Sequence, residues 1–201
     1  MNFQIFKTKC NTTEKVFISI LTISLLFLSY KVFYNTITLQ NILVYILLTI
    51  LFLVLAFLAY FDFKKMEVHN VTSLSLMILL TLLNLILYLL FKNNTEIRVL
   101  GNWVYNPYDN MMGALILGCI FQLIVILSKE KALGQGDVRI ALITGLLIGM
   151  SNLLLWSYLT VFTALIYGVV LVFKKKKFRN LRIPFLPFMI FSIFLIILSS
   201  L

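Results

Sequence analysis

The sequence predicts an all-α fold, a polytopic bundle of about seven transmembrane helices whose N-terminus is cytoplasmic. Three observations lead to this fold class. Of the 201 residues, 62% are hydrophobic and 12% are charged, which is more apolar side chain than a soluble domain of this length can bury. The apolar residues form runs long enough to cross a bilayer. The basic residues collect on one side of the resulting topology.

Seven apolar runs are candidate spans, because a membrane helix needs about 20 mainly apolar residues. They cover residues 16–33, 39–61, 71–91, 110–128, 138–150, 153–173 and 183–200. The first run is too long for the apolar region of a signal peptide, and no small-x-small cleavage site follows it, so it is interpreted as a retained anchor. The fifth is short, since its residues would reach only about 20 Å as a helix.

No linker and no shift in composition divides the chain. We therefore predict one membrane-embedded domain over residues 1–201, with an extra N-terminal span at 16–33 and a core over 39–200. The glycines of Gly145–Gly149 are four residues apart, a spacing that lets helices approach closely. We expect them to pack helices within the bundle, which would suit bringing the helix after Asp137 against the helix that ends at Asp62, with a homodimer as the alternative.

The positions of Lys and Arg determine the predicted orientation. With the N-terminus inside, 14 of the 17 basic residues lie in cytoplasmic segments, as the positive-inside rule requires. The short fifth span is supported by the same rule, because without it the Lys174–Lys177 run would lie outside. The net charge of +10 therefore reflects topology and the lipid bilayer, and nucleic acid is not expected as a partner. Trp103, Tyr105 and Tyr108 are interpreted as interfacial aromatics on the outer face.

Few side chains are available for metal or nucleophilic chemistry. Cys10 and Cys119 match no metal-ligand pattern, and His69 is the one histidine, so neither a zinc site nor a catalytic triad is expected. No phosphate-binding glycine loop occurs. We expect no metal and no cofactor.

Two of the three aspartates fall at the predicted cytoplasmic face. Asp62 directly follows the apolar run of the second span, and Asp137 precedes the fifth, whereas Asp109 lies on the opposite side. An ionisable group at the edge of a bilayer is costly and is usually functional. The alternatives are a juxtamembrane charge balanced by lysines for Asp62 and a helix N-cap for Asp137.

Two carboxyl groups held close together can hydrolyse a peptide bond. Such a pair shares one proton, because both groups do not ionise easily. The ionised carboxylate deprotonates a water, and the protonated carboxyl group donates to the carbonyl oxygen. Glycines beside Asp137 would let the backbone approach a substrate.

The segment around Asp137 is Gly134-Gln135-Gly136-Asp137-Val138-Arg139. It resembles the motif that gives its name to a group of Gly-x-Gly-Asp intramembrane aspartic proteases, and with two further motifs it resembles the type IV prepilin peptidase family of that group. Asn70 lies eight residues after Asp62, as the Asn of the family's Ile-Pro-Asn does. Ile183-Pro184-Phe185-Leu186-Pro187-Phe188 is similar to Ile-Pro-Phe-Gly-Pro-Phe. The chain departs from the family at His69, where Pro is usual, and at Leu186, where Gly is usual.

The resemblance implies a function. The enzyme would be an aspartic endopeptidase of the inner membrane that removes short basic leaders from prepilins, pseudopilins or competence proteins at the cytoplasmic face. Family members often carry a domain with two Cys-x-x-Cys pairs for N-methylation, which this chain lacks, so that activity is not expected. The implied catalytic residues are Asp62 and Asp137, and the implied substrate-binding or site-shaping residues are Gly134, Gly136, Arg139 and Asn70.

Two alternatives stay open at this point. Archaeal preflagellin peptidases have the same Gly-x-Gly-Asp placement and are not distinguished by these motifs. A small transporter or channel subunit could use Asp62 and Asp137 to bind a cation or relay protons.

Overall fold

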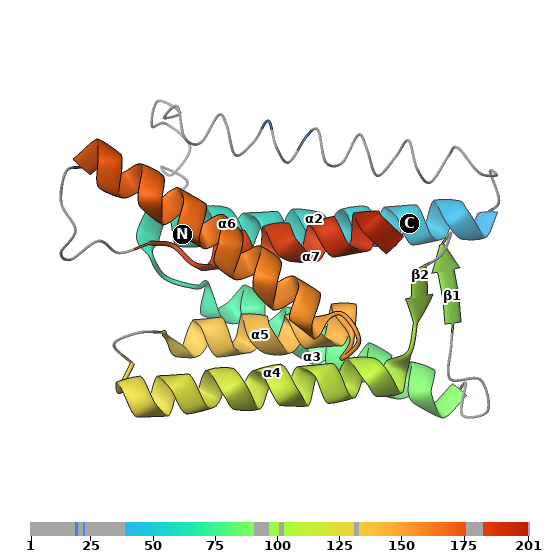
Figure 1. The fold of residues 1–201 in the computed structure, drawn as a ribbon. Coiled ribbons are helices and arrows are strands. Elements are labelled where there is room, and N and C mark those ends of the chain that lie inside the picture. The colour runs from blue at the N-terminus through green and yellow to red at the C-terminus, as the bar shows by residue number, and fades with distance from the viewer. Residues whose placement is uncertain are drawn as a thin grey trace. The chain divides into compact units, whose positions relative to one another are not determined.

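A computed structural model describes Ser19, Thr22 and residues 39–90, 97–100, 103–130, 133–175 and 183–200 (Figure 1). The chain divides into two compact units, Met1–Thr49 and Ile50–Leu201. In the first unit the described residues are Ser19, Thr22 and the start of a helix, so most of the predicted span at 16–33 lies outside the described residues. All residues of the candidate site belong to the second unit.

Helices make up most of the described chain, with one small antiparallel sheet. The elements in order are α2 (Leu39–Lys65), α3 (Asn70–Leu90), β1 (Ile97–Leu100), β2 (Trp103–Tyr105), α4 (Pro107–Ser128), α5 (Gln135–Ile148), α6 (Leu153–Lys175) and α7 (Leu186–Ser200). The prediction of a mainly helical bundle is therefore confirmed. The β1–β2 hairpin was not predicted by the apolar runs, which carry no signal for so short a pair of strands.

Four of the described helices are long and apolar enough to cross a membrane, namely those at Tyr45–Lys65, Asn70–Leu90, Pro107–Ser128 and Leu153–Phe173. The helix α5 has 14 residues and α7 has 15, so both are shorter than a typical span. The chain is thus a polytopic α-helical protein. The count of seven spans and the cytoplasmic N-terminus stay predictions.

The closest helix packing in the second unit joins α4 and α5, which lie side by side (Figure 1). A Cβ added to Gly145 would collide with the backbone of Gly113 and Ala114 in α4. Small residues let two helix backbones approach in this way. The expected packing of Gly145 within the bundle is therefore confirmed, but its close contacts are with α4 and not with α2.

Tyr105 at the end of β2 is buried, with 8% of its surface exposed, so its ring packs within the protein, and its place at the membrane interface stays a prediction. Its hydroxyl donates to the carbonyl oxygen of Leu146 in α5 at 3.4 Å. A buried phenol requires such a partner, and this one lies in a helix about 40 residues away in the sequence. Tyr108, in contrast, is exposed.

The buried helix α7 packs against both α2 and α6 within the second unit. The rings of Phe52 in α2 and Phe194 in α7 meet edge to face, with centroids 4.8 Å apart. The indole N–H of Trp156 in α6 donates to the carbonyl oxygen of Met189 in α7 at 3.1 Å. These contacts hold α7 against both α2 and α6.

Candidate active site

Asp62 lies in the last turn of α2, so the helix continues for four residues beyond the point where the predicted span ended. Its side chain is 7% exposed. A buried carboxylate needs hydrogen-bond donors, and the backbone N–H of Leu186 donates to its Oδ2 atom at 3.2 Å. Leu186 is the first residue of α7, where backbone N–H groups have no partner inside the helix. Asp62 therefore accepts one of the unpaired donors of α7, at the positive end of that helix.

Asp137 lies in the first turn of α5, in a different role from the helix N-cap considered from the sequence. Gly134 takes the N-cap position, with extended backbone angles. The N–H of Gly134 donates to Oδ2 of Asp137 at 3.0 Å, and the N–H of Asp137 donates back to the carbonyl oxygen of Gly134 at 3.1 Å. This reciprocal pair fixes the direction of the Asp137 carboxyl group.

Burial raises the pKa of the Asp137 carboxyl group, and the hydrogen bond from Gly134 opposes this with a smaller lowering. Burial disfavours the charged form because the surroundings solvate it poorly, whereas a donated N–H stabilises the charged form. The protonated state of Asp137 is therefore accessible at higher pH than in an ordinary aspartate.

The turn that carries Asp137 contacts the connection that follows Asp62, so the two carboxyl groups lie in the same region of the structure. They are separated by about 75 residues of sequence, and both belong to the unit Ile50–Leu201. Two acidic groups that interact by more than about one pKa unit titrate as a pair, in which one proton is shared. Such a pair can supply an ionised base and a protonated acid at the same pH.

Direct contacts join the segment that follows Asp62 to the segment that precedes Asp137. A Cβ added to Gly136 would lie only 2.5 Å from Cβ and Cγ2 of Val68, so the Gly134–Asp137 turn presses against the connection from α2 to α3. Only glycine leaves room for this approach. Gly136 thus allows the turn that carries Asp137 to meet the segment that leaves Asp62.

A second contact joins the same two segments. The Nη1 atom of Arg139 donates to Oδ1 of Asn70 at 3.0 Å, so the N-terminal part of α5 is held to the first residue of α3. The structure thus brings together all six residues singled out from the sequence, within two segments that meet. Asn70 is exposed and Arg139 is partly exposed, so both could be reached by a substrate.

His69, whose family counterpart is usually Pro, has a structural role here. Its Nδ1 atom accepts the N–H of Thr72 at 3.3 Å, and its carbonyl oxygen accepts the N–H of Ser73 at 3.1 Å. His69 therefore caps the N-terminus of α3, as Asn or Ser often does. Its ring also packs edge-on against Phe61, with centroids 5.2 Å apart, which positions α3 beside the last turns of α2.

Sequence reasoning missed two participants in this site. The backbone N–H of Leu186 carries no side-chain signal, although the resemblance had marked the segment around it. Val68 looks like an ordinary apolar loop residue. Within the part of the chain that the structure describes, no three His, Cys, Asp or Glu side chains gather in a way that could hold a metal ion.

Comparison with known proteins gives one match. The model of the type IV leader peptidase family matches residues 49–169, more than half of the chain. The match includes both aspartates, both glycines of the Asp137 turn, Asn70 and Arg139, and it ends before the Ile183–Phe188 segment. No curated protein and no solved structure matches the chain.

Proposed function

The chain belongs to the type IV leader peptidase family, and from this premise we propose that it is an aspartic endopeptidase in which Asp62 and Asp137 form the catalytic pair. One observation carries the proposal. Two segments far apart in the sequence meet through the Gly136–Val68 approach and the Arg139–Asn70 hydrogen bond, and each segment carries a buried or partly buried carboxyl group. A pair of this kind has the protonation states that peptide hydrolysis requires.

Each aspartate in this proposal uses one oxygen for positioning and the other for chemistry. Oδ2 of Asp62 accepts the N–H of Leu186, and Oδ2 of Asp137 accepts the N–H of Gly134. Their Oδ1 atoms are left to hold the attacking water and the carbonyl oxygen of the substrate. Carboxyl groups fixed from behind in this way need little reorganisation during the reaction.

The reaction itself needs no cofactor in this scheme. The ionised carboxylate of the pair takes a proton from water, and the water oxygen bonds to the carbonyl carbon of the substrate. The protonated carboxyl group donates its proton to the carbonyl oxygen, which gives a neutral tetrahedral diol. When the C–N bond breaks, the proton held by the first carboxyl group passes to the leaving nitrogen. In the same step the carbon fragment gives up one hydroxyl proton to the second carboxylate and becomes a carboxylic acid, and the starting protonation state returns.

The remaining site residues shape this centre. Gly136 allows the Asp137 turn to approach Val68, and Gly134 supplies the N–H that orients Asp137. Arg139 and Asn70 hold α5 to α3. Because these two polar side chains are accessible, they are also placed to bind the backbone of a substrate.

We place the substrate among type IV prepilins, pseudopilins and competence proteins, which pair a short basic leader with an apolar helix. The polytopic chain is embedded in the cytoplasmic membrane, and its active site faces the cytoplasm in this proposal. The excess of basic residues in the predicted cytoplasmic segments supports this side. The proposal covers peptide hydrolysis alone, and the family match to a peptidase leaves no observation that favours the transporter alternative.

The proposal is tested by co-expression with a leader-bearing prepilin and separation of the precursor and mature forms on a gel. We expect Asp62→Asn and Asp137→Asn each to abolish processing. Asp109→Asn is the matched control, because Asp109 accepts a hydrogen bond from the Ser151 hydroxyl at 2.6 Å and Asn keeps an oxygen for that bond. Processing at the wild-type rate by either site variant, at equal membrane levels, would contradict the proposal.

A further inference from the structure

Both contacts that join the two aspartate segments are made where α2 connects to α3. Val68, in the connection itself, meets Gly136, and Asn70, the first residue of α3, accepts the hydrogen bond from Arg139. His69 lies between these two residues in the sequence. A shift of His69 would therefore move both contacts together.

The imidazole ring of His69 attaches this connection to α2. It packs edge to face on Phe61, with ring centroids 5.2 Å apart, and on Phe57, with ring centroids 6.2 Å apart. Aromatic rings favour this geometry at these separations. Phe57 and Phe61 are about one helical turn apart, and Asp62 directly follows Phe61. The ring therefore sets the position of His69 relative to the part of α2 that carries Asp62.

The same side chain attaches the connection to α3. Nδ1 of His69 accepts the backbone N–H of Thr72 at 3.3 Å and lies 3.0 Å from the Thr72 hydroxyl oxygen. One half-buried side chain thus joins the last turns of α2 to the first turn of α3. The two connecting residues nearer to α2, Met66 and Glu67, are exposed in contrast.

We propose that His69 is a positioning residue for peptide hydrolysis, which acts through its two sequence neighbours on the turn that carries Asp137. The inference rests on the proposed function, because it concerns the geometry of the catalytic pair. The ring and Nδ1 place the connection, so that Val68 and Asn70 meet the Asp137 segment in one register. Without His69 the connection shifts against that segment, and the two carboxyl groups lose their relative position.

Three substitutions at position 69 separate the two attachments. His69→Ala removes both of them. His69→Phe keeps a ring that packs on α2 but has no acceptor for the N–H of Thr72. His69→Asn keeps an oxygen that caps a helix N-terminus but loses the ring. The purified proteins in detergent cleave a leader-bearing prepilin, and kcat and KM are measured for each at a temperature at which all are folded.

We expect His69→Ala to lower kcat about tenfold with a smaller change in KM. This loss is less than a displacement of a full ångström would cause, because the contacts of Val68 and Asn70 remain. His69→Phe and His69→Asn should each regain part of the lost kcat. Recovery in His69→Asn, whose side chain has no titratable group, separates positioning from proton transfer by the imidazole.

Two kinetic results would overturn the inference. One is a wild-type kcat in His69→Ala, including a rise in KM alone, which would assign His69 to substrate binding. The other is a kcat in both His69→Phe and His69→Asn that is as low as in His69→Ala. Wild-type protein that does not cleave the prepilin would instead contradict the proposed function.

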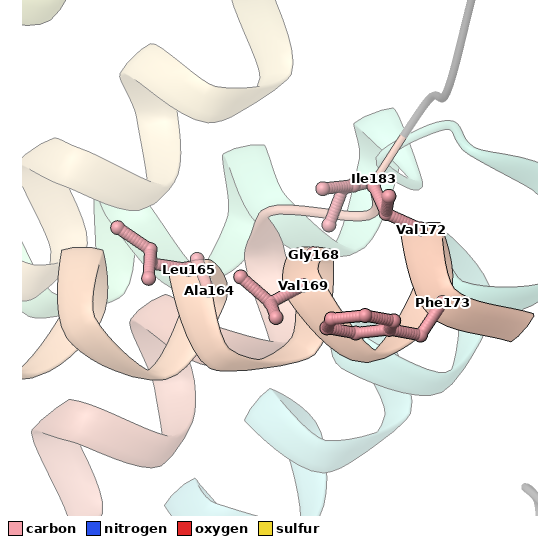
Figure 2. A pocket seen from close by; sticks show the side chains of 7 residues that line it. All are labelled: Ala164, Leu165, Gly168, Val169, Val172, Phe173 and Ile183. Carbon is pink, nitrogen blue, oxygen red and sulfur yellow. The ribbon is translucent and has the colours of Figure 1, made fainter. Parts of the chain in front are cut away.

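Two alanine variants away from the site control for a general loss of stability. Asn106→Ala removes a different helix cap, because the Asn106 side chain accepts two backbone N–H groups at the start of α4. Val169→Ala truncates a side chain in an apolar groove whose lining comes mainly from α6 (Figure 2). Both variants should keep the wild-type kcat. A tenfold loss of kcat in Asn106→Ala would show that removal of any helix cap slows cleavage, and would overturn the specific role of His69.

A double variant tests whether His69 acts through the contact at Gly136. A Cβ at Gly136 would collide with Val68, so the Asp137 turn is already displaced in Gly136→Ala and the loss of His69 has less left to change. Independent effects multiply, whereas effects that share one contact do not. We expect His69→Ala to slow the Gly136→Ala protein by less than about threefold. A further tenfold loss in the double variant would overturn the proposed route.

Discussion

The backbone N–H of Leu186 donates to Oδ2 of Asp62 at 3.2 Å, across 124 residues of sequence. This bond links the last turn of α2 to the first residue of α7. The side chain of Leu186 is fully buried, so the donor is held in place by the packing around it. A carboxyl group oriented from behind by a fixed donor has a defined position for its other oxygen.

Lengthening the side chain of Asp62 by one methylene group should therefore impair catalysis more than folding. In Asp62→Glu the carboxyl group either loses the Leu186 N–H or is displaced by about an ångström, and a displacement of this size costs on the order of 100-fold in rate. We expect kcat to fall by about that factor with KM little changed, as measured by cleavage in detergent. Glu67→Asp, at an exposed carboxyl group nearby, is the control for a one-methylene change. Full activity of Asp62→Glu would contradict the proposed geometry.

Gly136 and Gly134 should respond differently to the same substitution. A Cβ at Gly136 would lie 2.5 Å from Val68, whereas a Cβ at Gly134 would have no neighbour nearer than 3.9 Å. We expect Gly136→Ala to lower kcat/KM at least tenfold, because overpacking of about 1–3 kcal/mol displaces the turn that carries Asp137. The loss for Gly134→Ala should be smaller.

A second-site change tests whether the collision with Val68 is the cause. Val68→Gly removes the atoms that the new methyl group would meet, so the double variant Gly136→Ala with Val68→Gly should regain part of the lost cleavage activity. The activities of the four proteins are compared at equal membrane levels. Suppose that the single variant Val68→Gly is active but that the double variant is no more active than Gly136→Ala. The explanation by steric contact is then wrong.

The pH dependence of cleavage should move when the hydrogen bond to Asp137 is removed. The N–H of Gly134 lowers the pKa of Asp137 against the raising effect of burial. Gly134→Pro removes this N–H, so the ionised form loses a donor and the pKa rises further. Because activity is lost on the alkaline side when the pair gives up its shared proton, that limb should shift to higher pH. Profiles of kcat/KM for Gly134→Pro and Gly134→Ala, which keeps the N–H, are compared. Equal alkaline limbs would refute the assigned hydrogen bond.

The contact between α4 and α5 should dominate the stability of the second unit. A Cβ at Gly145 meets the backbone of α4, which cannot move aside, whereas a Cβ at Gly118 meets only the end of the Leu142 side chain. We expect Gly145→Ala to lower the free energy of unfolding by about 1–3 kcal/mol and Gly118→Ala by clearly less. Thermal unfolding of both proteins in detergent measures the difference, and a larger loss for Gly118→Ala would contradict the packing.

Local features of the sequence were sufficient to locate the elements of the site. The third predicted span, at 71–91, corresponds to α3 at Asn70–Leu90, because a run of apolar residues is a helix signal in itself. The sequence predicted the ends of the helices less accurately than their presence. The helix α5 begins at Gln135, before Asp137, because Gly134 caps its N-terminus. The apolar pattern starts only at Val138, so it did not indicate this earlier start.

The sequence by itself determined the membrane character of the chain, its helices and the two acidic residues set apart at the ends of apolar runs. These properties follow from composition and from neighbours within one or two helical turns. Only the tertiary structure decided that the N–H of Leu186 meets Asp62, that Val68 requires Gly136, and that Gly145 packs on α4. Contacts between distant segments depend on how whole helix surfaces fit together, and no single residue type encodes that fit.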